Sequence, residues 1–360
     1  MKERLRAISE AARAWRDPEY PRRVKAVART LSAGNRFTTQ ALAFAINQQM
    51  SLIGIVSLRR WLGNAPVETW KRVGVIEAGN IPFAGLQDYL AVSGLGHRFV
   101  GSVSARSPYL LPAFAADVEE RGGESGEFLP HEKLIRTVDA LIAAGTDQTM
   151  AELDASCEAA GIPESARLLR GNRYSVAVLD GTEHQDQRLR LAEDALLHEG
   201  LGCLNVALVF APVAADGDPY FEAFSVFRGT FPAHPATSGA LKMQQAFLAA
   251  VKAPHAYGDG LEYLVSRGEA EVQVPGHIRW VPYEDISEVH AWLAGHAGEI
   301  QVVSATPELR PQLPRTVASV TIGNTQRPSL DWRPDGQDTL AFLRGLGDEP
   351  GPGDERGLGA

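Results

Sequence analysis

The sequence predicts an α/β protein with a parallel sheet that is covered by helices on both faces. Two observations lead to this prediction. Short apolar runs typical of buried strands alternate with helical patterns along much of the chain, and 360 residues exceed what a single hydrophobic core usually holds. The 44% of hydrophobic and 22% of charged residues are ordinary for a globular protein. We therefore expect two α/β domains.

The individual elements follow from hydrophobic periodicity and from the positions of glycine and proline. Residues 2–61 should be mostly helical, with a break near 32–35. Strands are expected at 73–77, 98–104, 137–144, 174–179 and 205–211, with short ones near 271–274, 277–281 and 300–304. Helices are expected at about 83–92, 107–120, 148–160, 187–198 and 238–252. Residues 347–360, rich in glycine, proline and acidic residues, should form a disordered tail.

Composition also restricts the partners and the compartment. A formal net charge of −9 argues against nucleic acid or an anionic membrane as the main partner. The only cysteines, Cys157 and Cys203, make no disulfide framework, which favours a reducing compartment. No apolar run approaches the ~20 residues of a membrane span, and Met1–Arg6 opens a charged amphipathic helix pattern. We expect a cytoplasmic protein with no membrane span and no metal site.

The candidate nucleophile is Cys203. It follows Gly200, Leu201 and Gly202 at the junction between a helical pattern and an apolar strand pattern. The glycines let the backbone bend sharply, so the thiol can face a ligand, and backbone N–H groups at such a turn can stabilise a thiolate. A lone cysteine is often only a small buried hydrophobe, and this setting leaves the two interpretations about even. Cys157, inside a helical run, is expected to be structural.

Asn80 closes one strand and opens a helix, in Gly79-Asn80-Ile81-Pro82. Its side chain can cap that helix, which the spacing alone favours, or it can donate to an oxyanion near Cys203.

Gly145-Thr146 forms a similar junction, where backbone N–H groups at the start of a helix attract phosphate. An ordinary loop is the more common result of such a junction. His198 and Glu199, just before Cys203, are candidate bases, and a solvated helix end is the alternative explanation of both.

These motifs, in their shared order, resemble the aldehyde dehydrogenase superfamily. Gly79 to Phe83 is similar to the turn that carries the superfamily's oxyanion asparagine, and Gly145-Thr146 to its turn at the nicotinamide end of the cofactor. Other stretches resemble the acyl-CoA reductase branch, which includes the fatty-acid reductase of bacterial luminescence operons. These stretches are 175–181, 200–206, 322–328, Asp338-Thr339 and Phe342-Leu343. The resemblance covers about residues 70–346.

The resemblance implies a Rossmann-type cofactor domain beside a catalytic α/β domain, with the active site between them. Cys203 would attack an acyl thioester, carried by CoA or by a carrier protein, and form an acyl-enzyme. Asn80, with the backbone N–H of Cys203, would hold the oxyanion. NADPH would deliver hydride to the acyl carbon and release an aldehyde. The cofactor contacts would come from Gly145, Thr146, Ser102, Ser104 and Arg106.

Two departures from the superfamily pattern bear on the activity. Hydrolytic members carry a glutamate in a Glu-Leu-Gly-Gly motif that activates water, whereas the matching stretch here, 168–172, has no acid. This absence favours a reductase over a dehydrogenase. The usual cofactor-binding lysine is replaced by Ser102, although Arg98 and Arg106 lie nearby and arginine is a good partner for phosphate.

The expected division places an N-terminal helical segment at 1–62, a Rossmann-like cofactor domain at 63–182 and a catalytic domain at 183–346. The C-terminal part of the last can return to the cofactor domain. The predicted function is NADPH-dependent reduction of a fatty acyl thioester to an aldehyde. The alternatives are NAD(P)-dependent oxidation of a free aldehyde and a non-enzymatic partner protein that kept the fold. Homo-oligomerisation is suggested by family analogy alone.

Overall fold

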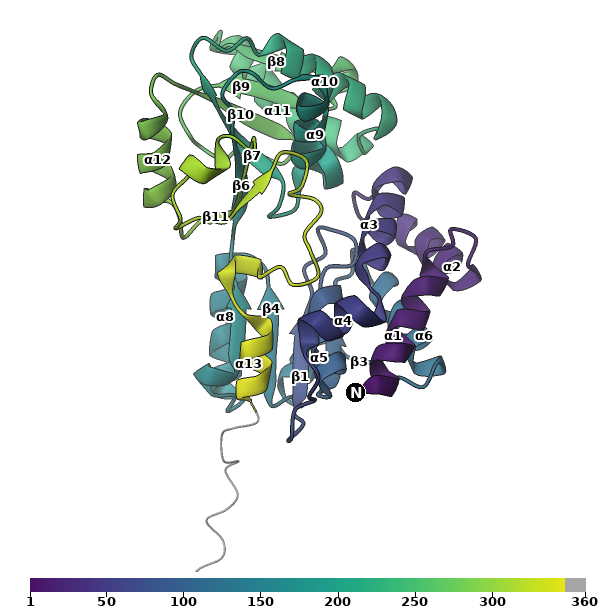
Figure 1. The fold of residues 1–360 in the computed structure, drawn as a ribbon. Coiled ribbons are helices and arrows are strands. Elements are labelled where there is room, and N and C mark those ends of the chain that lie inside the picture. Colours follow the sequence, from purple (N-terminus) through teal and green to yellow (C-terminus); the bar gives the residue numbers. More distant parts are fainter. Residues whose placement is uncertain (347–360) are drawn as a thin grey trace, which may run out of the picture.

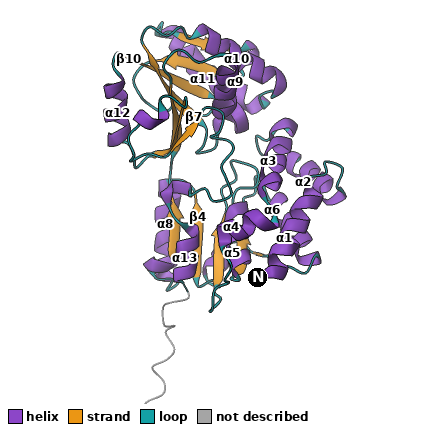
Figure 2. Ribbon diagram, viewed as in Figure 1, coloured by secondary structure: helices purple, strands orange, loops and turns teal. Residues whose placement is uncertain are grey.

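Two separate β-sheets organise the protein, which we describe from a computed structural model. The structure describes residues 1–346, so the expected tail at 347–360 lies outside the described residues. Figure 1 shows the two sheets in separate lobes, and Figure 2 shows that helices surround both of them. The fold class is therefore α/β, as predicted.

The first sheet has five strands, and all of its neighbouring strands run parallel, in the order β3-β2-β1-β4-β5. The chain builds outward from β1 through β2 to β3, then returns to place β4 and β5 on the other side. The carboxyl ends of β1 and β4 therefore form a topological switch point, which is where open α/β sheets bind ligands. The strands are β1 (Arg72–Ile76), β2 (Arg98–Ser102), β3 (Glu127–Phe128), β4 (Ala140–Ala144) and β5 (Arg167–Arg170).

The helices of this half share one hydrophobic core with the sheet. The N-terminal helices pack against α5 and α6, so the segment 1–62 is part of this half. The last helix, α13, packs against α5, and its Leu343 lies in the same core. The helices are α1 (Lys2–Trp15), α2 (Pro21–Leu31), α3 (Thr39–Leu52), α4 (Ile55–Leu62), α5 (Leu86–Leu95), α6 (Leu110–Glu120), α7 (His131–Ile135), α8 (Asp147–Ala159) and α13 (Thr339–Gly345).

The second sheet has seven strands in the order β12-β11-β6-β7-β10-β9-β8, with only the β8–β9 pair antiparallel. Separate apolar clusters cover its two faces. Its strands are β6 (Tyr174–Val178), β7 (Val206–Pro212), β8 (His255–Tyr257), β9 (Leu264–Arg267), β10 (His277–Tyr283), β11 (Ile300–Ala305) and β12 (Ser319–Thr321). Its helices are α9 (Gln185–Leu196), α10 (Asp218–Thr230), α11 (Pro235–Ala250) and α12 (Ile286–Gly295).

The chain crosses to the second sheet earlier than the expected boundary at 182. Strand β6 pairs with β7 and β11, so residues 174–178 belong with the half that carries Cys203. A strand's hydrogen-bond partners decide its sheet, and these partners lie far ahead in the sequence. The return of α13 to the first half follows the same logic, because its apolar face meets α5.

Several expected elements differ from the structure, and β4 and α6 begin three residues later than expected. The strand expected at 271–274 is absent, since these residues have no ladder partner, and β8 and β9 occupy that part of the sheet instead. Helix α5 begins at Leu86 and not near Phe83, because Phe83 (φ 56°) and Gly85 (φ 78°) adopt left-handed backbone.

Among residues 1–346, no single helix is long and apolar enough to cross a membrane. Helices α3 and α4 satisfy the length and composition criteria only as a pair, which is bent by 73°.

Candidate active site

Cys203 lies in a turn immediately before β7, at the amino edge of the second sheet. Its carbonyl accepts a hydrogen bond of 2.8 Å from the Ser175 hydroxyl at the start of β6. The Asn205 side chain holds the rest of the turn. Its Oδ1 accepts from the Gly202 N–H (2.9 Å), and its Nδ2 donates to the Leu197 carbonyl (2.7 Å). Buried and partly buried hydrogen bonds therefore fix the turn that carries Cys203.

A left-handed turn leads into this segment. His198 (φ 54°), Glu199 (φ 61°) and Gly200 (φ 70°) adopt positive φ in succession. A Cβ at residue 200 would lie 2.8 Å from the backbone nitrogen of Gly276, so only glycine fits here. The two non-glycine residues in this conformation store strain that surrounding contacts must offset.

Glu199 is held by such contacts. Its carboxylate pairs with Arg228 (3.2 Å) and accepts hydrogen bonds from the Thr237 hydroxyl (2.5 Å) and the His234 N–H (3.1 Å). Glu199 is 2% exposed, so neither a solvated helix end nor a free base describes it. The solvated interpretation from the sequence is wrong for this residue, because its partners on α10 and α11 lie far along the chain.

His198 keeps the properties of a proton acceptor. Burial lowers its pKa to about 4, so the ring is neutral at pH 7. Its Nδ1 is buried and has no hydrogen-bond partner among the described residues.

Asn80 reaches from the first sheet to the turn that carries Cys203. It follows β1, and its Nδ2 donates a hydrogen bond of 2.7 Å to the carbonyl of Leu201, two residues before Cys203. Helix α5 starts after Gly85 and has no side-chain cap, so Asn80 is not the helix cap that its spacing favoured. A primary amide has two N–H donors, and one remains for a ligand.

Cys203 is half-buried, and desolvation is the largest influence on the pKa of its thiol. Desolvation, followed by the negative charge of Asp335, raises its pKa to about 11, while the Leu204 backbone N–H and Arg170 act in the opposite direction. At neutral pH most molecules therefore hold the thiol form.

Arg170 and Asp335 are residues that sequence reasoning missed. Arg170, at the end of β5, pairs with Asp88 (2.8 Å) and donates to the Thr339 hydroxyl (2.8 Å), with both charges buried. Asp335 has a left-handed backbone (φ 57°), and its Oδ2 lies 3.8 Å from the Nε of Arg173. Neither residue has a local sequence signal, because each reaches the site only through contacts distant in the chain.

The residues expected to contact a cofactor lie at the carboxyl edge of the first sheet. Ser102 ends β2, and Gly145 and Thr146 follow β4. Gly79 packs against Ser104 so closely that a Cβ at position 79 would lie 2.0 Å from the Ser104 hydroxyl oxygen. The loops after β1, β2 and β4 thus meet at one edge.

Two places at this edge can be compared as phosphate sites, the start of α8 and the loop after β2 that carries Arg106. The Thr146 hydroxyl already caps α8 by accepting from Thr149 N–H (3.1 Å), and Asp147 adds negative charge at that helix start. Arg106 is exposed, and its guanidinium forms no hydrogen bond or ion pair with the described residues. A phosphate therefore fits beside Arg106, after β2, better than at the start of α8.

The described residues contain no group of three or more His, Cys, Asp or Glu side chains that could hold a metal ion. Four phenylalanines of the second half lie in or pack against one apolar cluster with Tyr263 and Trp280, so they are core residues and not the lining of a tunnel for a fatty chain. They are Phe221, Phe224, Phe227 and Phe231.

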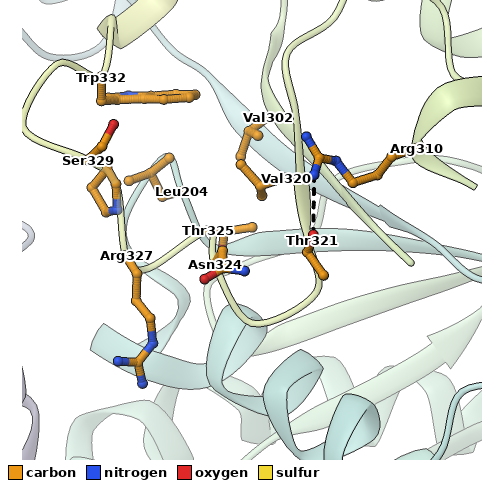
Figure 3. Close-up of a pocket in the computed structure, with 11 residues that line it drawn as sticks. Leu204, Val302, Arg310, Val320, Thr321, Asn324, Thr325, Arg327, Ser329 and Trp332 are labelled. Carbon is orange, nitrogen blue, oxygen red and sulfur yellow. Dashed lines mark hydrogen bonds between the residues drawn. The ribbon is translucent and has the colours of Figure 1, made fainter. Parts of the chain in front are cut away.

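A cavity of about 290 Å³ opens next to the nucleophile turn, and Leu204 forms part of its wall. The segments that line it come from β11, β12 and the loop after β12. Figure 3 shows Trp332 and Arg310 on opposite sides of this space, with Leu204, Val302 and Val320 between them.

Solved structures identify this architecture. A benzaldehyde dehydrogenase from Corynebacterium glutamicum, described as NAD-dependent, superposes with a TM-score of 0.66 at 17% identity, covering 89% of this chain and 80% of that one. A Streptococcus pyogenes succinic semialdehyde dehydrogenase in complex with NADP⁺ matches with a TM-score of 0.64 at 15% identity, covering 89% of this chain and 80% of that one. An NAD-dependent aldehyde dehydrogenase from Sinorhizobium meliloti matches with a TM-score of 0.67 at 14% identity, covering 89% of this chain and 73% of that one.

The chain has the aldehyde dehydrogenase fold. No model of a known protein family matches the sequence, and no curated protein matches it either. The two parallel α/β sheets match this fold, which has a Rossmann-type domain and a catalytic domain. This agrees with the fold predicted from the sequence.

Proposed function

We propose that this protein reduces an acyl thioester to an aldehyde with NADPH, through an acyl-enzyme on Cys203. The observation that carries the proposal is a hydrogen bond of 2.7 Å between the two halves. Asn80, which follows a strand of the first sheet, donates it to the carbonyl of Leu201, two residues before Cys203 in the turn that precedes β7. The aldehyde dehydrogenases that share the fold favour aldehyde chemistry.

The first half-reaction needs only groups of this chain. The Cys203 thiolate attacks the thioester carbon, a new carbon–sulfur bond forms, and the carbonyl electrons move to oxygen. The free N–H of Asn80 and the backbone N–H of Cys203 donate to that oxyanion. When the oxyanion collapses, the bond to the donor sulfur breaks and its thiolate leaves.

Bound NADPH would supply the hydride that reduces the acyl carbon. After that transfer, the carbon–sulfur bond to Cys203 breaks, and the aldehyde leaves while the thiolate is restored. The stretch 168–172, which resembles the site of the glutamate motif in hydrolytic members of the superfamily, contains no acid, so no acid on β5 would activate water against the acyl-enzyme. Arg106 would hold the cofactor phosphate.

Oxidation of a free aldehyde is the second candidate, and Asp335 favours it. The negative charge of Asp335 raises the pKa of the Cys203 thiol, so this carboxyl lies close enough to be a candidate base, and burial raises its own pKa. A dehydrogenase would turn over aldehyde and NAD(P)⁺ without CoA, whereas the reductase run in reverse requires CoA. Assays of aldehyde with and without CoA distinguish the two.

Replacement of the nucleophile tests the proposal. Cys203→Ala should abolish acyl-CoA-dependent NADPH oxidation and the acyl adduct seen by intact-protein mass spectrometry without reductant. Cys157→Ala, which removes the other thiol, is the matched control and should keep both. Asn80→Ala should lower kcat by roughly 10²–10³-fold, the usual effect of losing one oxyanion donor. Unchanged turnover in Cys203→Ala would refute the mechanism.

A further inference from the structure

The cavity beside Leu204 has a positive charge that no carboxylate of residues 1–346 neutralises. Two of its lining residues are arginines, Arg310 and Arg327, and none is acidic. Polar side chains of Asn324 and Ser329 also line it. The remaining lining is mostly apolar, so the cavity suits a ligand with an apolar part and an anionic part.

Arg327 is not the free charge. Its guanidinium makes a double hydrogen bond to Glu193 (2.9 and 2.9 Å) and lies over the Phe44 ring, 4.8 Å from the ring centre. Figure 3 shows the side chain directed away from Trp332 and the cavity.

Arg310 is the free charge. Its bonds go only to neutral oxygens, the Ser319 carbonyl (2.9 Å) and the Thr321 hydroxyl (3.3 Å), and no carboxylate of the described residues pairs with it. Its Nε–H is buried and has no acceptor. A guanidinium has five N–H donors, so most of this fork is left for a ligand. Carboxylates and phosphates match such a fork in shape and charge.

We propose that this cavity binds an anionic group of the substrate, carboxylate or phosphate, through Arg310. The inference rests on the proposed function, because Leu204 connects the cavity to the nucleophile turn. It also specifies the substrate class. A volume of about 290 Å³ lies at the lower end for ligand sites, so the group is short and acidic and not a long fatty chain.

Binding of glutarate, a short dicarboxylate, tests the cavity without any turnover. Calorimetry with the unmodified protein should detect glutarate, and Arg310→Gln should weaken its binding by roughly tenfold or more, since a charge-assisted hydrogen bond is lost. Arg310→Lys keeps the charge but not the forked set of N–H donors, so its affinity for glutarate should lie between those of the unmodified protein and Arg310→Gln. Arg315→Gln is the matched control, because it removes an equal charge from an exposed position on the same segment. Equal affinities in Arg310→Gln and the unmodified protein would overturn the proposal, as would no binding of glutarate or inorganic phosphate at all.

Kinetics identify the source of the anion. If it belongs to the reacting chain, Arg310→Gln should raise KM for 5-oxopentanoate and leave KM for pentanal unchanged. If it belongs to the donor, the variant should raise KM for a CoA thioester but not for the matching N-acetylcysteamine thioester, which has no phosphate. If Arg310→Gln changes the KM of neither 5-oxopentanoate nor the CoA thioester, the cavity does not bind an anionic group of the substrate and the proposal is refuted. Arg310-dependent glutarate binding in a protein that turns over none of these substrates would retain the site and reject the proposed function.

Discussion

Cys203 lies among opposing electrostatic influences. Desolvation and the charge of Asp335 raise the pKa of its thiol, whereas the Leu204 N–H and Arg170 lower it, and the result is a value of about 11. This state protects the sulfur from oxidation and alkylation, because thiolate is the reactive form. Activation then requires a change in the surroundings, such as the arrival of substrate in the site.

The rate of alkylation of Cys203 should report this pKa. Because the thiolate fraction increases about tenfold per pH unit below the pKa, labelling by iodoacetamide should keep increasing from pH 7 to near pH 11. Mass spectrometry of the labelled protein gives the rate, and Cys203→Ser provides the background from the buried Cys157. A plateau near pH 8 would contradict the expected shift.

At the scale of elements, the turn at 198–200 connects α9 to the nucleophile. Its left-handed residues are costly, at about 1–3 kcal/mol each, and the buried carboxylate of Glu199 supplies the compensating contacts. Its partners lie on α10 and at the start of α11. The turn therefore contacts three helices, α9, α10 and α11, and its shape determines where Cys203 and the start of β7 lie.

Removing the Glu199 carboxylate should destabilise the protein strongly. Glu199→Ala leaves the Arg228 guanidinium buried and unpaired, which costs about 3–5 kcal/mol. Urea unfolding measures the loss. Glu193→Ala is a suitable control, because it breaks a partly exposed ion pair with Arg327 at a cost of about 1 kcal/mol or less. Equal losses in the two variants would show that the turn does not depend on this pair.

At the scale of the whole molecule, a few contacts join the halves across the site. Besides the bond from Asn80 to Leu201, Phe44 of α3 packs against Phe231 of the second half, with ring centres 6.2 Å apart. Arg327 then lies over the same Phe44 ring. The N-terminal helices therefore help to position the two sheets relative to each other, beyond stabilising the first one.

Cofactor binding should be visible as stabilisation of the folded chain. At about 100 times Kd, NADPH should add about 2.7 kcal/mol to the free energy of unfolding, because it binds only the folded state. Arg106→Gln should reduce this effect for NADPH and leave that of NADH unchanged, since the two differ by one phosphate. Arg98→Gln, at the opposite end of β2, is the matched control. Failure of both cofactors to raise the thermal midpoint would favour the non-enzymatic alternative.

Local pattern was sufficient for most strands and for the fold class. Apolar runs such as 73–77 and 205–211 became β1 and β7, because burial on both faces of a parallel sheet requires such runs. The local pattern wrongly predicted a strand at 271–274, where apolar and polar residues alternate but no neighbouring strand is available for pairing. Short edge strands such as β8 have too few residues to display a period.

The sequence by itself determined the α/β class, the glycine-flanked turn of Cys203 and the strand–helix junctions at Asn80 and Gly145, because these depend on neighbouring residues. Only the tertiary structure decided that Asn80 donates to the turn that carries Cys203, that the Glu199 carboxylate is buried and paired, and that Arg310 faces a cavity with no counter-ion from residues 1–346. Each of these depends on groups brought together from distant parts of the chain. Charge pairing and burial act through space, so they become readable only when the chain has folded.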